Sequence, residues 1–371
     1  MSHESSLHTQ VGVTFLPKLN SRVYIPLFEA CGGFEGFFLE SDAALNALYP
    51  KFHLKKDCFN RKQALERAKR ELEYIDRLAI RVCSTEHYQY PFLLGQCEDA
   101  PLVFYYKGEL YTDDRQYIAI VGTRKASVHC RCRVERIIEE LHTFCPSLVT
   151  VSGLAFGIDI TAHQASLKYD VPTYAVLGHG LHTIYPASHK NLAEKIVAQK
   201  GALITEFPCL SSIFPANFLQ RNRIIAGLCQ ATFIAESAVK GGAMATARIA
   251  QSYAREVMAL PGRPEDSMSA GCNWLIKQNI AALVENGKDI AQIMGINTEL
   301  PALSQDEKPT LFPDDSPEAI VLRILTEHQG LDIDRLSIYS QIPMGKLSAL
   351  LTKLELEEHI LALPGKNYII K

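Results

Sequence analysis

Residues 152–163 (SGLAFGIDITAH) form the stretch whose residue types and spacing most clearly suggest chemistry. Gly153, Gly157 and Asp159 fall where the β-branched run at 148–151 ends and an amphipathic helical pattern begins. Glycines let a ligand approach the main chain, and the first turn of a helix leaves unpaired N–H donors with a partial positive charge. The stretch therefore predicts an anion site, with phosphate as the first ligand to consider, although a tight turn alone also explains the glycines.

A second candidate element is the segment 218–228, which carries Arg221, Asn222 and Arg223 at the predicted beginning of a helix. Guanidinium groups bind phosphate oxygens with two donors, and an asparagine amide can read a base edge. The arginines can instead pair with Glu206 or Glu236, and we expect this for one of the two. For Asp159 we expect a helix-capping role and for Glu206 a buried ion pair, rather than a catalytic acid and base.

Short apolar runs alternate with helix-length amphipathic segments through the middle of the chain. Strands are predicted at 101–106, 117–121, 148–151, 174–177, 202–205, 231–235 and 257–260. Helices are predicted at 127–144, 159–169, 188–199, 218–228 and 243–253. This alternation predicts an α/β domain with a doubly wound, mostly parallel sheet, because right-handed crossovers bury both faces of its apolar strands.

The turns that follow these strands predict one shared crevice, since ligands bind beyond the carboxyl ends of the strands in open sheets. The turns at 122–125, 152–153, 178–180 and 236–242 carry glycine, hydroxyl or cationic groups. Gly178 and Gly180 lack the third glycine of a dinucleotide fingerprint, because Thr183 stands in its place. The pattern disfavours an NAD site, and we expect no cofactor.

The N-terminal part of the chain has helical periodicity over 16–78 without a strand signal, which predicts a small helical domain at 1–89. It contains a basic cluster that either contacts a polyanion or forms a solvated helix face. The members of this cluster are Lys51, Lys55, Lys56, Arg61, Lys62, Arg67, Lys69 and Arg70. We expect the solvated face.

The C-terminal part follows a proline-rich, acidic stretch that predicts a linker at 297–315 after a sheet domain at 90–296. Helices predicted at 317–328, 333–341 and 344–357, with a hairpin at 360–370, are typical of a winged helix at 316–371. Its presumed recognition helix carries Lys346 and Lys353 but is followed by a cluster of glutamates. Because that charge disfavours duplex DNA, we expect this domain to dock a protein or to regulate.

The composition of the chain limits the kinds of binding site and partner that it can have. The formal net charge is −3, so a nucleic-acid site must be a local groove rather than the whole surface. The ten cysteines include no C-x-x-C pair and the twelve histidines no H-E-x-x-H spacing, so we expect reduced thiols and no metal site. The polar start of the chain and the absence of roughly 18 consecutive apolar residues predict a cytoplasmic protein with no membrane partner.

Taken together, these segments resemble those of the DNA-processing protein A family, also called DprA or Smf. The resemblance keeps order and spacing over residues 90–294. It rests on VGTR at 121–124, residues 152–163, LGHGL at 177–181, YP at 185–186, EFP at 206–208, FP at 214–215, RNRIIAGL at 221–228, Glu236, GGAMATA at 241–247, PG at 261–262 and GCNWLI at 271–276. The chain departs from the family pattern at Gly241, where a serine is usual, and at His179, where small residues are common.

The resemblance implies a Rossmann-like sheet domain flanked by an N-terminal helical domain, similar to SAM or helix-hairpin-helix modules, and a C-terminal winged helix. It implies a protein without enzymatic activity that binds and protects single-stranded DNA, helps to load the RecA recombinase in natural transformation, and forms a homodimer through the Rossmann-like domain. The DNA contacts that it implies are Gly122, Arg124, Gly153, Gly180, Lys190, Arg221 and Asn222.

Two other function classes stay open. Phosphoribohydrolases of the lysine-decarboxylase-like class are similar in their sheet, but they use a P-G-G-x-G-T-x-x-E loop, and here Arg248 stands where the catalytic glutamate would be. A sensor that binds a small nucleotide in the crevice is the second alternative.

Overall fold

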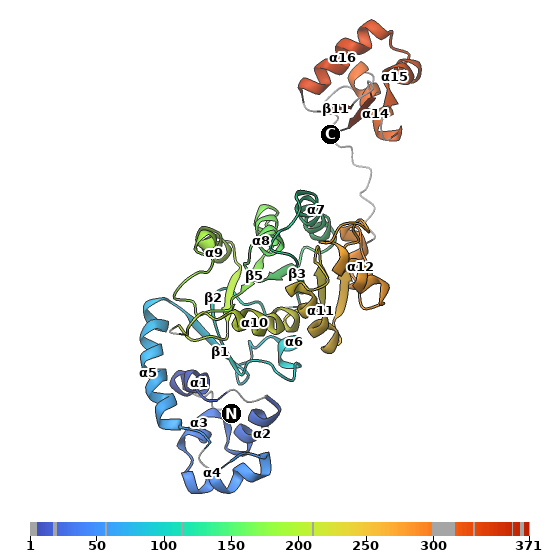
Figure 1. The fold of residues 1–371 in the computed structure, drawn as a ribbon. Helices are drawn as coiled ribbons and strands as arrows, with labels where there is room; N and C mark the ends of the chain where they lie inside the picture. The colour runs from blue at the N-terminus through green and yellow to red at the C-terminus, as the bar shows by residue number, and fades with distance from the viewer. Residues whose placement is uncertain are drawn as a thin grey trace. The chain divides into compact units, whose positions relative to one another are not determined.

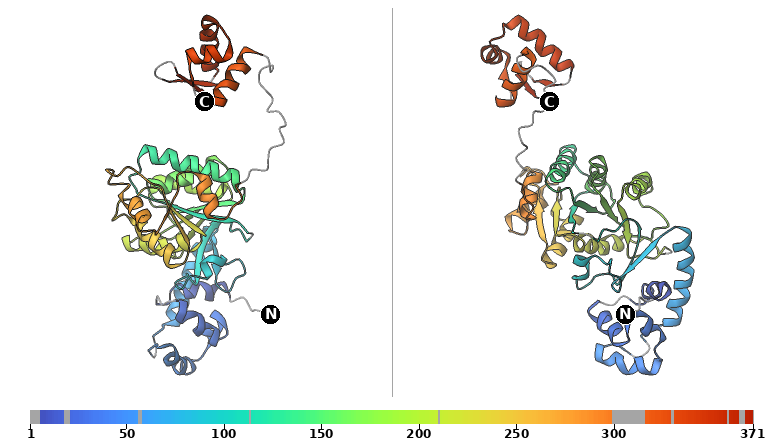
Figure 2. Two further views of the ribbon diagram at one scale, coloured as in Figure 1. Left: turned by 90° about the vertical axis from the view of Figure 1, so that its right-hand side faces the viewer. Right: turned by 180° about the vertical axis from the view of Figure 1, so that it is seen from behind.

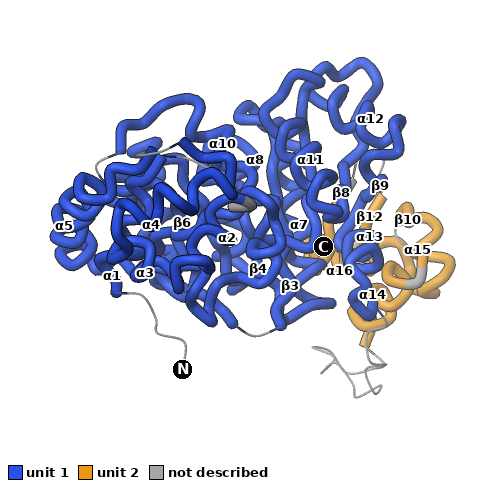
Figure 3. Tube along the Cα trace, turned by 90° about the horizontal axis from the view of Figure 1, so that it is seen from below, with its two compact units in different colours: residues 1–298 blue, residues 299–371 orange. Residues whose placement is uncertain are grey.

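The computed structural model describes residues 6–17, 21–55, 58–112, 114–209, 211–298, 316–328, 331–357, 359–363 and 367–370. These residues fall into two compact units, Met1–Thr298 and Glu299–Lys371 (Figure 3). Most of the predicted linker, 299–315, lies outside the described residues, and the predicted boundary at residue 89 stays a prediction. No helix in the described ranges combines the length and the apolar composition that a membrane span requires.

A nine-stranded sheet forms the centre of the first unit, with the strand order β1-β2-β6-β5-β4-β3-β7-β8-β9. The strands are β1 (Arg81–Ser84), β2 (Val103–Gly108), β3 (Gln116–Val121), β4 (Leu148–Ser152), β5 (Thr173–Val176), β6 (Ala202–Thr205), β7 (Ala231–Ile234), β8 (Glu256–Ala259) and β9 (Ala282–Leu283). The pairs from β6 to β9 are parallel, whereas β1–β2 and β2–β6 are antiparallel. The predicted mostly parallel α/β sheet is therefore confirmed.

Helices cover both faces of this sheet, as its continuously buried strands require (Figure 1). One face carries α7 (Val128–Phe144), α8 (Ile158–Lys168), α9 (Lys190–Ala198) and α13 (Gly287–Ile293). The other face carries α6 (Phe92–Gly95), α10 (Pro215–Gly227), α11 (Gly242–Ser252) and α12 (Ala270–Lys277). Both cores consist mainly of aliphatic side chains from the strands and helices, with a few aromatic rings such as Phe104, Tyr174 and Phe233.

The N-terminal helices gather beside the β1–β2 edge of the sheet (Figure 2). They are α1 (Leu7–Val13), α2 (Ser21–Ala30), α3 (Gly33–Leu39), α4 (Asp42–Leu48) and α5 (Arg61–Arg77). Serine and asparagine caps begin α1, α4 and α5, at Ser6, Ser41 and Asn60. Their core is aromatic, with Phe28 in edge contact with Phe34 and Phe37.

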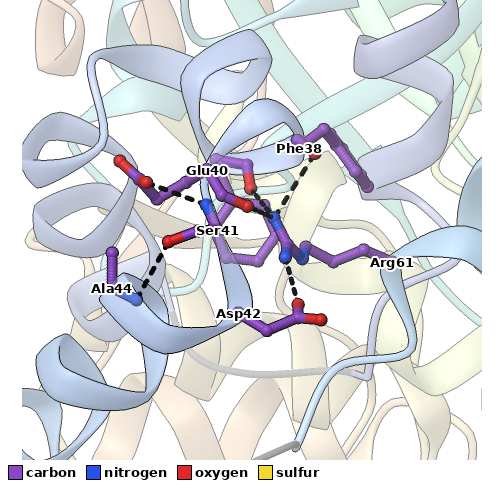
Figure 4. Close-up of polar contacts among 7 residues, drawn as sticks. Phe38, Glu40, Ser41, Asp42, Ala44 and Arg61 are labelled. Atoms are coloured by element: carbon purple, nitrogen blue, oxygen red, sulfur yellow. Dashed lines mark hydrogen bonds and ion pairs between the residues drawn. The ribbon is translucent and has the colours of Figure 1, made fainter.

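Arg61 shows that part of the predicted basic cluster is structural. Its guanidinium donates hydrogen bonds to the carbonyls of Phe37 (2.7 Å), Phe38 (3.3 Å) and Glu40 (2.6 Å), and to the Asp42 carboxylate (Figure 4). These carbonyls lie at the C-terminal end of α3, where four acceptors would otherwise lack partners. Another member of the cluster, Arg67, lies over the Phe15 ring, and Lys56 is outside the described residues.

The second unit has the three helices and the hairpin of the predicted winged helix. The elements are α14 (Pro317–His328), α15 (Ile333–Ser340), α16 (Met344–Leu356), β10 (Leu331–Asp332), β11 (Ile360–Leu363) and β12 (Asn367–Ile370). β12 pairs antiparallel with both other strands. The predicted turn at 364–366 and Glu358 lie outside the described residues.

Two elements differ from the sequence-based prediction in ways that matter for the site. α10 begins at Pro215 rather than at 218, because Pro at the first helical position extends the helix backward. Arg221 therefore lies inside the helix and not at its beginning. The residue before α8 is Gly157, at φ +78°, so Asp159 lies in the first turn and is not the cap that we predicted.

We expect Arg61→Ala to lower the unfolding free energy of the first unit by about 2–3 kcal/mol, because it removes hydrogen bonds from a charged donor and leaves the α3 carbonyls without partners. Urea unfolding followed by circular dichroism measures this change. Arg61→Lys should recover little of the loss, since one ammonium group cannot replace the planar guanidinium. Lys62→Ala, at an exposed position, is the control, and a loss as small as the control's would contradict the capping role.

Candidate nucleic-acid interface

A cavity of about 370 Å³ opens at the carboxyl ends of β3 and β7. Its walls come from four segments: the turn after β3, the beginning of α8, the middle of α10, and the loop that leads into α11. The lining residues include Gly122, Arg124, Asp159, Phe218, Leu219, Arg221, Asn222, Lys240, Gly241 and Gly242. The cavity lies at the edge of the sheet where the crevice was predicted.

Arg221 lies beneath this cavity rather than reaching out of it. Its side chain is only 3% exposed, and its Nη1 donates a hydrogen bond to the Val176 carbonyl at 2.8 Å. A Cβ atom on Gly153 would stand 1.7 Å from that same Nη1, so the guanidinium occupies the space that any side chain at 153 would need. Among the described residues its Nε has no hydrogen-bond partner. The glycine of the SGL turn thus makes room for an arginine rather than for a ligand.

Asp159 is the counter-charge to this buried cation. Burial lowers the pKa of the Arg221 guanidinium to about 10, while the Asp159 carboxylate opposes that shift and Arg124 adds to it. The pKa of Asp159 is in turn raised by burial, and Arg221 and the Ala155 N–H oppose the rise. Ala155 donates this N–H to Asp159 at 3.3 Å. Arg221 therefore stays charged at neutral pH and supplies a fixed positive field under the cavity.

The first turn of α8 is a poorer phosphate site than the sequence predicts. The Ile158 N–H donates to the Thr123 carbonyl and the Ile160 N–H to the Ala155 carbonyl, both at 3.1 Å, and the Asp159 carboxylate adds negative charge there. The beginning of α11 suits an anion better. Its N-cap, Gly241, makes no side-chain bond to the first turn, and Gly242 lines the cavity.

The neighbouring arginine confirms the predicted ion pair. Arg223 Nη2 lies 2.5 Å from a Glu206 oxygen, and both side chains are largely buried. Arg223 Nη1 also donates to the Asp99 carbonyl. Glu236 is buried too and accepts a hydrogen bond from the Ser127 N–H at 2.8 Å. Arg223 is thus engaged in structure and leaves Arg124 as the exposed arginine of the cavity.

The structure brings together four of the seven predicted contacts, since Gly122, Arg124, Arg221 and Asn222 all line the cavity. The other three lie elsewhere. Gly153 is packed against Arg221, and Gly180 is buried against Pro208 and Cys209. Lys190 is exposed at the beginning of α9 and does not line the cavity.

Sequence reasoning missed several exposed side chains around this edge of the sheet. Lys240 lines the cavity and is exposed. Four large apolar side chains are 51–59% exposed on the segments that lead into α8, α9 and α10 and on α10 itself: Phe156, Tyr185, Phe214 and Leu219. Exposed aromatic rings beside a cationic groove are the usual platform for unpaired bases. The sequence contained a signal for these exposed residues, because each lies in a predicted turn or at the predicted beginning of a helix, at the edge formed by the carboxyl ends of the strands.

Comparisons with known proteins agree with this geometry. The family model described as "DNA recombination-mediator protein A" matches residues 81–295, and the model described as "DprA winged helix domain" matches residues 305–366. The first match alone spans more than half of the chain. The chain belongs to the DprA/Smf family. The resemblance inferred from its motifs is therefore confirmed, as are the α/β fold and the winged helix.

Several relatives cover most of this family member. Protein Smf of Escherichia coli is 35% identical over 285 residues, which are 74% of each chain. DNA processing protein DprA of Streptococcus pneumoniae is 38% identical over 201 residues, 54% of this chain and 70% of the relative.

Two solved structures share the fold. The X-ray structure of DprA from Streptococcus pneumoniae superposes with a TM-score of 0.64 at 28% identity, covering 78% of this chain and 98% of that one. A structure of DprA from Helicobacter pylori, described with its single-stranded DNA binding mode, has a TM-score of 0.52 at 26% identity. The match covers 59% of this chain and 97% of that one.

A buried histidine connects α8, the helix that carries Asp159, to strand β5. His163 on α8 is fully buried, and its Nδ1 lies 2.8 Å from the Thr173 hydroxyl, which belongs to a network with Thr150 and Ser166. Burial, together with the neighbouring Arg221 and His189, lowers the pKa of His163 to about 3. The imidazole is therefore neutral in the folded protein.

The His163 pKa predicts an acid-sensitive fold. The unfolded chain protonates this histidine below pH 6.5, whereas the folded protein resists protonation down to about pH 3. Stability should therefore fall as the pH falls through that window, by about 3 kcal/mol at pH 4 from this group alone. Urea unfolding at pH 7 and pH 4 measures the loss. His163→Gln should reduce the loss of unfolding free energy between pH 7 and pH 4, whereas His182→Gln, at an exposed position, should leave that loss unchanged. Equal losses in the two variants would contradict a role for His163.

Proposed function

We propose that this protein binds single-stranded DNA in the cavity at the carboxyl edge of its sheet and that it acts without catalysing a reaction. The observation that carries the proposal is the gathering of exposed cations and a helix N-terminus at one cavity over a buried arginine, with exposed aromatic rings on the segments that lead into α8, α9 and α10. Membership of the DprA/Smf family supports it, since the Helicobacter pylori relative is described as binding single-stranded DNA.

In this arrangement each group has a distinct role. Arg124 and Lys240, exposed on two different segments of the cavity wall, contact phosphate oxygens, and the beginning of α11 offers backbone N–H groups. Arg221 acts from below as a fixed charge and does not touch the strand, because its side chain is buried. Asn222, which is half-buried in the cavity wall, supplies an amide for a base edge.

Unpaired bases fit the apolar part of this edge. The Tyr185 and Phe218 rings lie 5.8 Å apart, and Phe156 packs edge-on against His189 at 4.7 Å. Stacking on such rings is worth about 1–3 kcal/mol per base and tolerates any sequence. A duplex, whose bases are already stacked and paired, gains none of this energy, so the site prefers single strands.

The chemistry of the cavity favours binding over hydrolysis. Asp159 is the carboxylate that lines it, and this group is buried, accepts a hydrogen bond from Ala155 and balances Arg221. Arg248, at the position of the catalytic glutamate in related phosphoribohydrolases, is exposed on α11 and does not line the cavity. Among the described residues, no exposed carboxylate and no histidine thus lines this crevice.

The wider role follows from the same site. One protomer offers few contacts to a strand, so affinity for long DNA depends on several protomers or on a homodimer formed through the Rossmann-like domain. We propose that the bound strand is protected and passed to the RecA recombinase in the cytoplasm, as the family resemblance implies, with the winged helix docking a protein. We also propose domains at 1–89, 90–296 and 316–371; the division into two compact units after residue 298 supports the separation of the last domain, whereas β1, at Arg81–Ser84, pairs with β2 and ties the end of the first domain to the sheet.

Fluorescence anisotropy of labelled oligo-dT and of a matched duplex, titrated across a salt series, tests this function. We expect wild-type protein to prefer the single strand, and Arg124→Ala and Lys240→Ala each to weaken binding and to reduce the salt slope by about 0.7. Arg221→Ala should weaken binding without that loss of slope, because it removes a field rather than a contact.

The control is Lys277→Ala, at an exposed lysine on α12 that does not line the cavity. Binding by the Arg124→Ala/Lys240→Ala double variant as tight as that of the control would place the DNA elsewhere. A preference for a mononucleotide over the oligonucleotide would support the nucleotide-sensor alternative instead.

A further inference from the structure

The N-terminal helix α5 and the loops of the candidate crevice share one hydrophobic core. Ala68 and Ile75 of α5 belong to the same buried cluster as Leu154, in the turn after β4, and Leu177 and Leu181, in the turn after β5. These turns follow neighbouring strands at the carboxyl edge of the sheet. α5 therefore packs into the same core as the segments that shape one side of the crevice.

Glu71 adds a polar contact to this apolar interface. Its carboxylate is 1% exposed, and one oxygen accepts a hydrogen bond from the Cys209 N–H at 2.5 Å. Glu71 lies one turn from both Ala68 and Ile75, on the buried face of α5. Cys209 is itself buried, and its burial and the nearby Glu71 charge raise the pKa of its thiol to about 12. A buried carboxylate holds the backbone N–H that donates to it strongly, since a hydrogen bond to an ionised acceptor is stronger than one to a neutral acceptor.

The backbone that Glu71 holds supports the turn after β5. A Cβ atom on Gly180 would stand 2.4 Å from the Pro208 carbonyl oxygen and 2.6 Å from the Cys209 Cα. Gly180 is therefore in close contact with Cys209, whose N–H donates to Glu71, and with the preceding Pro208. A shift of Cys209 changes the space that Gly180 occupies.

His179 links the backbone of Gly180 to the backbone of Tyr185, at the rim of the crevice. Its Nε2 accepts a hydrogen bond from the Tyr185 N–H at 3.1 Å, and its Nδ1 lies 3.0 Å from the Gly180 carbonyl. Because Nε2 is an acceptor, Nδ1 carries the proton and donates to Gly180. The half-exposed Tyr185 ring then lies 5.8 Å from that of Phe218, which lines the cavity.

We propose that Glu71 is a positioning residue for single-stranded DNA binding: through Cys209, Gly180 and His179 it fixes the 178–186 turn and its Tyr185 ring at the edge of the crevice. This inference rests on the proposed function. It assigns the N-terminal helical domain a part in binding that does not require its own basic residues to touch DNA. It also explains why a histidine, which can bridge two backbone groups, stands at 179.

The test compares variants of the full-length protein by three measurements: oligo-dT affinity, thermal midpoint, and hydrogen exchange of residues 178–186. We expect Glu71→Ala to weaken oligo-dT binding at least fivefold and to speed exchange in the 178–186 turn, because the Cys209 N–H loses its buried acceptor. Glu71→Gln should bring the affinity back to within about threefold of wild type, since its amide oxygen can still accept that hydrogen bond.

Two controls separate positioning from simple loss of stability. Ile75→Ala removes apolar packing from the same face of α5 but leaves the Glu71 hydrogen bond, so it should lower the thermal midpoint and keep the affinity within twofold of wild type. Glu73→Ala, at an exposed site on α5, should change neither.

Equal affinities and equal exchange in Glu71→Ala and wild type would overturn the inference. So would an Ile75→Ala protein that binds as weakly as Glu71→Ala, or a Glu71→Gln protein that shows no recovery. Wild-type protein that fails to bind oligo-dT would instead refute the proposed function. In that case, hydrogen exchange still reports whether Glu71 fixes the turn.

Discussion

The burial of the Arg221 guanidinium is the constraint on which the crevice depends. A charge removed from water is costly unless hydrogen bonds and a counter-charge compensate for it. The Val176 carbonyl and the Asp159 carboxylate provide this compensation, and they come from the end of β5 and the first turn of α8. The guanidinium in turn requires glycine at 153, after β4. One side chain from α10 thus ties three turns together and leaves a permanent positive charge under the cavity.

This constraint separates the residues that shape the site from those that are free to contact a ligand. Arg223 is paired with Glu206, and Asp159 offsets only part of the cost of burying the Arg221 charge, so none of these four side chains is free to contact a ligand directly. Arg124 and Lys240 remain exposed at the surface of the cavity. A chain with a net charge of −3 can therefore still offer a local groove to phosphate. The buried core next to these turns also contains residues of α5, in the N-terminal helical part of the chain.

The sequence was sufficient to predict what depends on local pattern. Alternating apolar strands and helices predict the parallel strands from β3 to β8 and the winged helix to within a few residues, and the charges predict the pairing of one arginine with Glu206. The edge strands β1 and β9 were missed, because β1 begins at an exposed residue and lacks the continuous apolar run of the buried strands, and β9 is only two residues long. No local pattern shows that the Arg221 side chain, 68 positions away, occupies the space of a Cβ atom on Gly153, and the contact of Gly153 with DNA stays a prediction. Gly180 and Glu71 are likewise explained only by long-range contacts, which no local pattern encodes.

The central claim is that single-stranded DNA lies in the crevice over Arg221, and photo-cross-linking tests it most directly. Oligo-dT carrying 5-iodouracil would be irradiated with the full-length protein, and the cross-linked peptides identified by mass spectrometry. We predict cross-links to the peptides that contain Phe156, Tyr185 and Phe214, whose rings are exposed on the segments that lead into α8, α9 and α10. Cross-links confined to α5 or to residues 316–371 would contradict it.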